Sequence, residues 1–209
     1  MRAFYRKFLK RFLDTCVAII LGVLLSWLLV IVAILVKLTS KGPIFFKQER
    51  FGLNSKPFTL YKFRSMTNGA PVKANSEFED ITSYVTPFGM FIRKTSIDEL
   101  PQLLNIIKGD MSFIGPRPLA VTDKKVLVLR KKSGADQVRP GISGLAQVNG
   151  RNNITDENKA AYDAKYVSRL SIQLDIVLII ETLISVIKRD GIFKTENMLD
   201  VRKNTGNDD

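Results

Sequence analysis

The chain has 209 residues, with 32 lysines and arginines against 20 acidic residues, no histidine and one cysteine. The lack of histidine excludes a Ser-His-Asp triad and a histidine base, and one cysteine excludes an intramolecular disulfide and a Cys/His zinc site. The formal net charge of +12 indicates a polyanionic partner, either phosphorylated substrates or anionic lipid headgroups. Nucleic acid is not expected as a partner, because no nucleic-acid motif is present and the basic residues are dispersed through turns.

Residues 1–40 predict a membrane-associating segment. Basic and aromatic residues alternate over residues 2–12, a pattern suited to a headgroup interface. Residues 15–36 carry no charge, and a helix of about 20 such residues covers the hydrocarbon core of about 30 Å. Five basic residues lie in residues 1–16 and four in residues 37–52. Basic flanks stay cytoplasmic, so this symmetry favours a re-entrant helix, with a spanning helix as the alternative.

Residues 44–50 and 58–64 have strand character and flank a turn-forming stretch, which predicts a small β-hairpin. Alternation along the second strand places Lys62 and Arg64 on the same face as Phe58 and Leu60. The two cations either protect a strand edge or belong to a binding site. The polar residues 67–86 predict a loop on the surface or over that site.

Residues 93–118 concentrate the groups that could carry chemistry. Apolar residues recur there at helical spacing: Leu100, Leu103, Leu104 and Ile107. Gly109 stands at the expected C-cap, and Asp98 and Glu99 stand at the N-terminal end, where anions such as phosphates are held. Residues 96–99 also fit a capping box, in which the acids are structural. Stiff turns that carry Arg117, Arg139 and Arg151 favour phosphate recognition instead.

The second half of the chain predicts three helices and a compact turn region. Residues 121–132 predict a basic helix, in contact either with the membrane or only with solvent. Residues 143–151 are punctuated by glycine, and Gln147, Asn149 and Arg151 offer donors to a phosphate or nucleobase. Residues 162–168 predict a mixed helix, and residues 174–187 predict an apolar helix too short to span a bilayer, with Asp175 at its start.

Four sequence runs resemble those of the bacterial sugar transferase family of monotopic phosphoglycosyl transferases. They are YKFRSM (61–66), SIDELPQ (96–102), KGDMSFIGPRP (108–118) and RPGISGLAQVNGR (139–151). The resemblance extends from about residue 5 to about residue 190. We therefore expect an α+β protein with a membrane segment at 1–40 and a polar tail at 191–209. Between them, residues 41–190 are expected to form a mainly helical catalytic domain with interfacial amphipathic helices.

The resemblance implies transfer of a sugar-1-phosphate from a UDP-sugar to undecaprenyl phosphate, with release of UMP. It places this step at the cytoplasmic face of the bacterial inner membrane, in contact with its phospholipids, as the first membrane step of a surface glycan or glycoconjugate pathway. By analogy with small family members, we expect an N-acetylated amino sugar. The pathway (capsule, exopolysaccharide, O-antigen or glycoprotein glycan) and the oligomeric state, with a homodimer as one option, are left open.

The residues allow roles to be assigned for this chemistry. We expect Asp98 to be the nucleophile that forms a covalent phosphosugar intermediate and to contact Mg²⁺, with Glu99 as its electrostatic or positioning partner. Arg117 is expected to stabilise the diphosphate. Further phosphate-binding candidates are Arg93, Lys62 and Arg64, of which the resemblance places the last two beside the active site. Candidates for binding the nucleotide sugar are Arg151, Gln147, Asn149 and Asp175, the last by resemblance only.

Three alternatives remain open at this stage. A direct, single-step transfer would use the acids only to hold the metal. A membrane-anchored scaffold protein would use the acids as a capping box and the cations for lipid headgroups. The topology is also open, because family members typically break the membrane helix with a Ser-Pro pair, whereas this chain has Ser26-Trp27. Gly22 and Ser26 still permit a bend.

Overall fold

The computed structural model describes residues 4–70, 83–150 and 154–187. It is a mixed structure, mostly helical, with a β-hairpin and a short parallel strand pair among these residues. The elements in the first part of the chain are η1 (Tyr5–Leu9), α2 (Lys10–Leu24), α3 (Ser26–Thr39), β1 (Phe45–Phe51), η2 (Leu53–Ser55) and β2 (Pro57–Phe63). They are followed by α4 (Pro87–Lys94), η4 (Ile97–Glu99), α5 (Gln102–Lys108), β3 (Ser112–Ile114), α6 (Lys124–Ser133), β4 (Gly141–Ser143), α7 (Leu145–Val148), α8 (Asp156–Arg169) and α9 (Ile172–Ile187).

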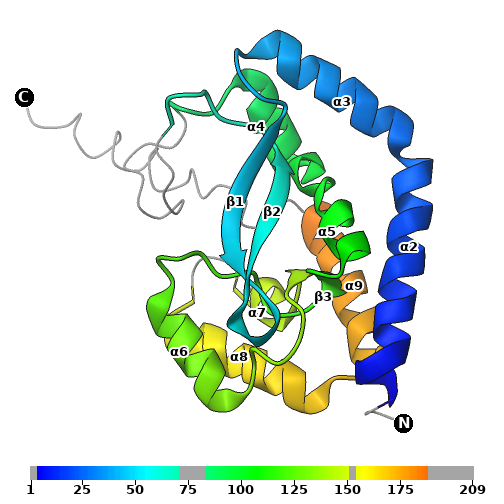
Figure 1. Ribbon diagram of the computed structural model, residues 1–209, viewed down its shortest axis with the longest axis vertical. Coiled ribbons are helices and arrows are strands. Elements are labelled where there is room, and N and C mark those ends of the chain that lie inside the picture. The colour runs from blue at the N-terminus through cyan, green and yellow to red at the C-terminus, as the bar shows by residue number, and fades with distance from the viewer. Residues whose placement is uncertain (1–3, 71–82, 151–153, 188–209) are drawn as a thin grey trace, which may run out of the picture.

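Helices α2 and α3 form a bent pair along one edge of the molecule (Figure 1). Their axes meet at 64°, and the break falls at Leu25, whose φ of −95° and ψ of 4° depart from the helical values on either side. A bend beside Ser26 was expected, and it forms without a proline. Among the described helices, none alone has the length and apolar character needed to cross a bilayer, and this pair meets that test only as a bent unit.

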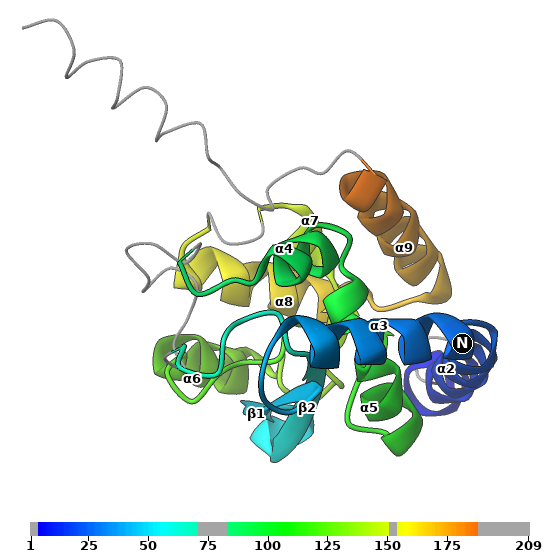
Figure 2. The ribbon, with the colours of Figure 1, turned by 90° about the horizontal axis from the view of Figure 1, so that it is seen from above.

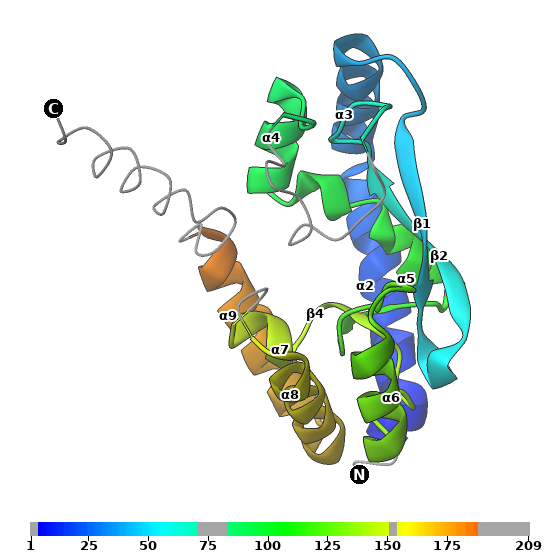
Figure 3. The same ribbon diagram turned by 90° about the vertical axis from the view of Figure 1, so that its left-hand side faces the viewer.

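Three hydrophobic clusters follow one another along the bent pair. The first joins Tyr5 to Tyr166 and Leu178, the second joins Ala18 to residues of β2 and α5, and the third joins Val32 and Val36 to β2 and α4. Figures 2 and 3 show the hairpin on one side of α2 and helices α8 and α9 on the other. The bent pair therefore provides the surface on which the other elements are assembled.

The predicted β-hairpin is confirmed. Strands β1 and β2 pair antiparallel, with Phe45 opposite Phe63 and Phe51 opposite Pro57. Helix α5 packs against β2 through Asn105, whose Nδ2 donates to Thr59 O at 2.7 Å while Tyr61 N donates to its Oδ1 at 3.1 Å. These bonds satisfy a fully buried amide side chain.

The predicted apolar face of the helix after the acids is wrong at one position. Leu104 is 49% exposed, whereas Asn105 and Ile106 are fully buried. The reason is that the hydrogen bonds of Asn105 to the sheet fix the rotation of α5 and turn Leu104 outward. The predicted C-cap is confirmed, since Gly109 ends the helix with a φ of 94° in the left-handed region.

The predicted capping box does not form. Ser96 has a φ of 56° and makes no side-chain capping bond. Asp98 and Glu99 lie in the separate 3₁₀ turn η4, and α5 begins only at Gln102. The acids therefore precede the helix instead of starting it, and the purely structural explanation for the pair loses its basis.

A parallel strand pair that the sequence patterns do not predict joins two of the four motif runs. Ser112 pairs with Gly141 and Ile114 with Ser143. The backbones beyond these strands are in direct contact, because a Cβ atom added at Gly141 would lie 2.1 Å from Gly115 N. Glycine is required here by close approach. The contact brings the 108–118 and 139–151 runs together.

The helices of the second half are confirmed with shifted bounds. The basic helix α6 begins at Lys124 and buries Val126 and Arg130. Helix α8 begins before the predicted segment, where the Thr155 hydroxyl accepts from Asn158 N at 3.3 Å. Helix α9 extends from Ile172 to Ile187 and exposes an apolar face. The predicted polar tail, 191–209, lies outside the described residues.

Candidate active site

A hollow lies between the hairpin, the acidic turn η4 and the Pro116-Arg117-Pro118 turn. The lining residues are Arg50, Leu60, Lys62, Glu99, Gln102, Arg117, Pro118, Gly141 and Ile142. They come from all four motif runs and from β1. The hollow measures about 300 Å³ with its open side included, at the lower end of ligand pockets. It is therefore large enough for a diphosphate, and a larger ligand would extend beyond it.

Glu99 and Lys62 form the ion pair at the centre of the hollow. Lys62 Nζ donates to Glu99 Oε1 at 2.5 Å. Burial by itself raises the pKa of Glu99, but the charges of Lys62 and Arg117 and hydrogen bonds from Lys62 and Gln102 outweigh it and lower the pKa below its usual range. Glu99 is therefore ionised at neutral pH and fixes the position of Lys62.

Asp98 differs from its neighbour although the two are adjacent. Its side chain is buried, with 8% of the residue exposed, and no ion pair within 4 Å forms to it among the described residues. Burial raises its pKa to about 6, Glu99 adds to this rise, and Lys62 and Arg93 offset part of it. Asp98 adjoins the hollow next to Glu99 without lining it. At pH 7 it is a largely ionised carboxylate without a tight cationic partner, which suits a nucleophile.

Arg117 is held by its backbone and projects its side chain to the surface. It stands between two prolines, and its carbonyl accepts from Arg130 Nη1 at 2.8 Å. Arg130 is itself fixed by a buried ion pair with Asp163, at 2.7 Å from both Nε and Nη2. Helices α6 and α8 thus position the turn, and the guanidinium of Arg117 stays available to an anion.

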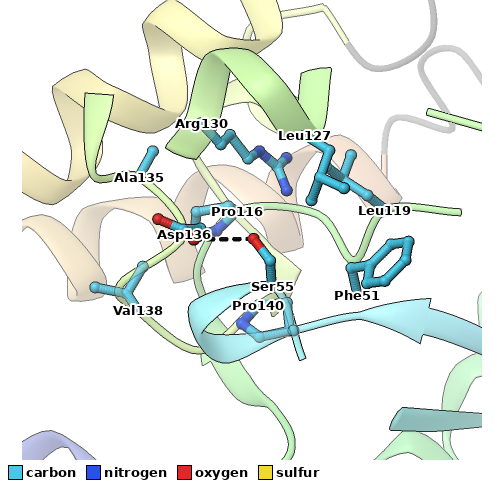
Figure 4. A pocket seen from close by; sticks show the side chains of 11 residues that line it. Phe51, Ser55, Pro116, Leu119, Leu127, Arg130, Ala135, Asp136, Val138 and Pro140 are labelled. Carbon is cyan, nitrogen blue, oxygen red and sulfur yellow. Dashed lines mark hydrogen bonds between the residues drawn. The ribbon is translucent and has the colours of Figure 1, made fainter. Parts of the chain in front are cut away.

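A second pocket lies on the far side of Pro116, between the hairpin turn and α6 (Figure 4). Its lining is mainly apolar, and Ser55 Oγ donates to Asp136 Oδ2 at 2.9 Å within it. Arg130 reaches this pocket but is already engaged by Asp163 and by Arg117 O. We therefore assign this pocket to packing of the hairpin turn against α6.

Two residues of the hollow were not among the predicted site residues. Arg50 was counted only as a flanking charge, and Gln102 only as part of a motif. The hairpin pattern contains a signal for Arg50, because its cross-strand partner is Phe58, on the face that carries Lys62. Gln102 is buried and hydrogen-bonds Glu99, a contact that depends on where α5 begins.

Arg93 and Arg64, both predicted to bind phosphate, have different surroundings. Arg93 is partly buried near the acids, where burial lowers its pKa and the charges of Asp98 and Glu99 partly offset this. Arg64 is buried and points to the end of α3, donating to Ser40 O and Ser40 Oγ at 2.7 Å each. Since β2 ends at Phe63, Arg64 leaves the face that carries Lys62 and anchors α3 instead.

Asp175, predicted to bind the nucleotide sugar, lies in a different cluster. It is buried and accepts from Tyr5 Oη at 2.6 Å, from Lys10 Nζ at 2.7 Å and from Tyr166 Oη at 2.7 Å. These bonds join α9 to the N-terminal helices and to α8. The structure therefore gives Asp175 a structural role and does not bring it to the hollow.

The remaining predicted nucleotide-sugar ligands lie around α7. Asn149 is exposed, and its Nδ2 donates to Leu145 O at 2.8 Å. The buried amide atoms of Gln147 have no hydrogen-bond partner among the described residues. Arg151 lies outside the described residues. Its role, like the nucleotide-sugar roles of Gln147 and Asn149, stays a prediction.

Comparison with known proteins places the chain in a family. Residues 5–189 match the bacterial sugar transferase family. The chain is 43% identical over 201 residues to the uncharacterized sugar transferase EpsL of Bacillus subtilis, covering 96% of this chain and 98% of that protein. It is 40% identical to the UDP-glucose:undecaprenyl-phosphate glucose-1-phosphate transferase of Klebsiella pneumoniae, covering 83% of this chain and 39% of that protein.

A third relative is named for a different sugar. The UDP-N-acetylgalactosamine-undecaprenyl-phosphate N-acetylgalactosaminephosphotransferase of Aeromonas hydrophila is 38% identical over 192 residues, covering 88% of this chain and 45% of that protein. The chain thus spans nearly all of one relative and less than half of the other two. The match over residues 5–189 and these relatives identify the chain as a member of the bacterial sugar transferase family, a class of phosphoglycosyl transferases.

Proposed function

We propose that this protein transfers a sugar-1-phosphate from a UDP-sugar to undecaprenyl phosphate and releases UMP, through a covalent intermediate on Asp98. The observation that carries the proposal is the difference between two adjacent acids beside a cationic hollow. Glu99 is paired with Lys62, whereas Asp98 has no ion pair within the described residues and a pKa raised by burial to about 6. Family membership and the names of the relatives support the same reaction class.

The proposed reaction has two balanced steps. In the first, an Asp98 carboxylate oxygen bonds to the β-phosphorus, and the bond from that phosphorus to the bridging oxygen breaks, so that UMP leaves with the electron pair. In the second, an oxygen of the lipid phosphate bonds to the same phosphorus and the Asp98 oxygen leaves as a regenerated carboxylate. Lys62 and Arg117 balance the phosphate charge, and Glu99 keeps Lys62 in place.

Magnesium belongs to this proposal. The described residues contain no group of three or more acidic or cysteine side chains suited to a metal. A Mg²⁺ ion commonly takes one or two carboxylates and completes its shell with water and substrate phosphates. The carboxylates of the acidic turn fit that pattern, with Asp98 as the protein ligand. When bound, the ion would neutralise phosphate charge.

We propose an N-acetylated amino sugar as the transferred group. The relative from Aeromonas hydrophila, named for N-acetylgalactosamine, supports this choice. The relative from Klebsiella pneumoniae is named for glucose, which makes UDP-glucose the principal competitor. A panel of UDP-sugars decides between them.

We propose that the bent pair is a re-entrant membrane segment, with the catalytic residues on the cytoplasmic side of the bacterial inner membrane. The 64° bend and the similar basic content of both flanks support a chain that enters and leaves on one side. Large apolar side chains exposed on the pair also support insertion: Phe12, Ile20, Val23, Trp27, Val30, Ile34 and Leu38. Cysteine labelling at both ends of the pair in intact cells tests the topology, and labelling from opposite sides would contradict it.

The reaction is tested with purified protein, Mg²⁺, undecaprenyl phosphate and a panel of UDP-sugars. We expect UMP release only when the lipid phosphate turns the enzyme over, apart from a single stoichiometric burst without it. Trapping a protein-bound radiolabelled phosphosugar in that burst would distinguish the covalent route from direct transfer. Silence across a broad panel, including diamino sugars, would favour a non-enzymatic scaffold.

A further inference from the structure

Arg50 lies in the hollow beside Arg117 and has no role in the reaction described so far. Both residues line the hollow with Lys62 and Glu99. Lys62 is paired with Glu99, but within the described part of the chain neither arginine forms an ion pair within 4 Å. Two guanidinium groups without a carboxylate partner therefore share one wall.

The side chain of Arg50 is held in place. Its Nε and Nη2 donate to Gln48 Oε1 at 3.1 and 2.6 Å, and its Nη1 donates to Pro118 O at 3.4 Å. Gln48 lies two residues earlier on the same face of β1, and Pro118 belongs to the turn that carries Arg117. The ordering of a long side chain is thus achieved before any ligand arrives, which removes part of the entropic cost of binding.

The electrostatics around Arg50 favour an anion. Burial lowers its pKa, the charge of Arg117 lowers it further, and Asp123 offsets only part of this. Placing two partly desolvated cations together costs free energy unless an anion lies between them. Paired arginine forks match phosphate oxygens, which accept two parallel hydrogen bonds from each fork.

The charges that act on each group order the residues along the hollow. Asp98 is influenced by Lys62, Glu99 and Arg93. Glu99 is influenced by Lys62 and also by Arg117. Arg50 is influenced by Arg117 and Asp123. Arg117 therefore stands between the acidic turn and Arg50, and Arg50 marks the end of the hollow away from Asp98.

We propose that Arg50 and Arg117 form one phosphate subsite that is occupied first by the leaving phosphate of UMP and then by the phosphate of the lipid acceptor. The inference rests on the proposed function. In-line displacement puts the leaving group opposite the attacking Asp98 oxygen. The second displacement breaks the bond to that same oxygen, so the acceptor phosphate must enter from the side that UMP has left. One pair of arginines serves both phosphates.

The inference is tested with Arg50→Met and Arg50→Lys in the turnover assay. For Arg50→Met we expect the inhibition constant of UMP and the KM of undecaprenyl phosphate to rise together, each by at least about tenfold, because two charge-assisted hydrogen bonds are lost. Arg50→Lys keeps the charge without the fork and should give a smaller rise in both. UMP should compete with the lipid phosphate in the wild type.

A matched control removes a cation from the same hairpin. Lys56 is exposed at the hairpin turn and is outside the lining of the hollow. Lys56→Met changes the net charge by the same amount as Arg50→Met, and it should leave both constants unchanged. A rise in only one constant for Arg50→Met would overturn the shared subsite, and wild-type values for both would exclude Arg50 from phosphate binding.

Calorimetric binding of UMP separates failure of this inference from failure of the proposed function, because it needs no turnover. Wild-type protein should bind UMP and folded Arg50→Met should bind it at least about tenfold more weakly. Equal binding by both proteins would overturn the inference while leaving the transferase intact. A wild type that neither binds UMP nor releases it would overturn both. A thermal unfolding curve confirms that each variant is folded.

Discussion

Two buried carboxylates in this protein show how similar burial serves different purposes. Asp175 and Asp98 are 4% and 8% exposed. Asp175 accepts hydrogen bonds from two tyrosines and a lysine, whereas Asp98 has no ion pair among the described residues. Burial alone therefore does not identify the reactive acid. The lack of a tight cationic partner does, because such a charge is stabilised only when a substrate or a metal arrives.

The tyrosines around Asp175 show the consequence of full satisfaction. Burial raises the pKa of Tyr166 and of Tyr5, and the hydrogen bonds to Asp175 raise both further. Both phenols therefore stay protonated and keep donating. This cluster is a permanent junction between η1, α2, α8 and α9, whereas the charges of the hollow still lack partners. The following predictions test this comparison, beginning with the largest effect.

Asp98→Asn should reduce turnover by at least about a thousandfold, because the amide is not a nucleophile. It should not destabilise the fold. Burial raises the pKa of Asp98 above its unfolded value, so the ionised form disfavours folding at pH 7 and the neutral amide removes that penalty. UMP release and the Tm measure the two effects. A Tm several degrees below wild type would mean that Asp98 is a structural acid like Asp175.

Asp175→Ala should have the opposite profile. Removing one member of a buried ion pair leaves Lys10 uncompensated and costs about 3–5 kcal/mol of folding free energy. The folded fraction should keep a turnover number within about threefold of wild type, because the cluster is remote from the chemistry in this account. Denaturant unfolding and active-site titration measure both quantities. A stable but inactive variant would instead favour the nucleotide-sugar role that the family resemblance implies.

The pH dependence should report the raised pKa of Asp98. The nucleophile must be ionised, so kcat/KM should fall about tenfold per pH unit below a pKa of about 6. Glu99→Gln removes a negative charge that raises this pKa, and the acidic limb should therefore shift to lower pH while the rate falls. Glu157→Gln, which changes an exposed acid, should leave the limb in place. An unshifted limb in Glu99→Gln would assign the titration to another group.

The smallest effect should come from the exposed pair of Lys125 and Glu157. Their charged atoms are 2.5 Å apart, as close as those of Lys62 and Glu99. Solvent screens an exposed pair, so Lys125→Met should leave both turnover and Tm unchanged. Lys62→Met, with an equal change of charge, should reduce kcat/KM by at least about tenfold. Equal responses of the two variants would contradict the distinction between solvated and functional pairs.

The sequence by itself determined the elements and most of the reactive groups. Alternation and turn residues predicted the hairpin, helical spacing and Gly109 predicted the helix at α5, and the uncharged run predicted the bent pair. The missing histidine and the adjacent acids narrowed the chemistry to carboxylates. These features are local, because they depend on periodicity and on residue type within a few turns of chain.

The tertiary structure decided which groups meet. The register of β1 against β2 and the position of the Pro-Arg-Pro turn brought Arg50 beside Arg117. The rotation of α5, fixed by Asn105, exposed Leu104, and the end of β2 at Phe63 sent Arg64 to α3. The parallel contact of Gly115 with Gly141 joined two distant motifs. Each outcome depends on contacts between residues far apart in the chain, which no local pattern encodes.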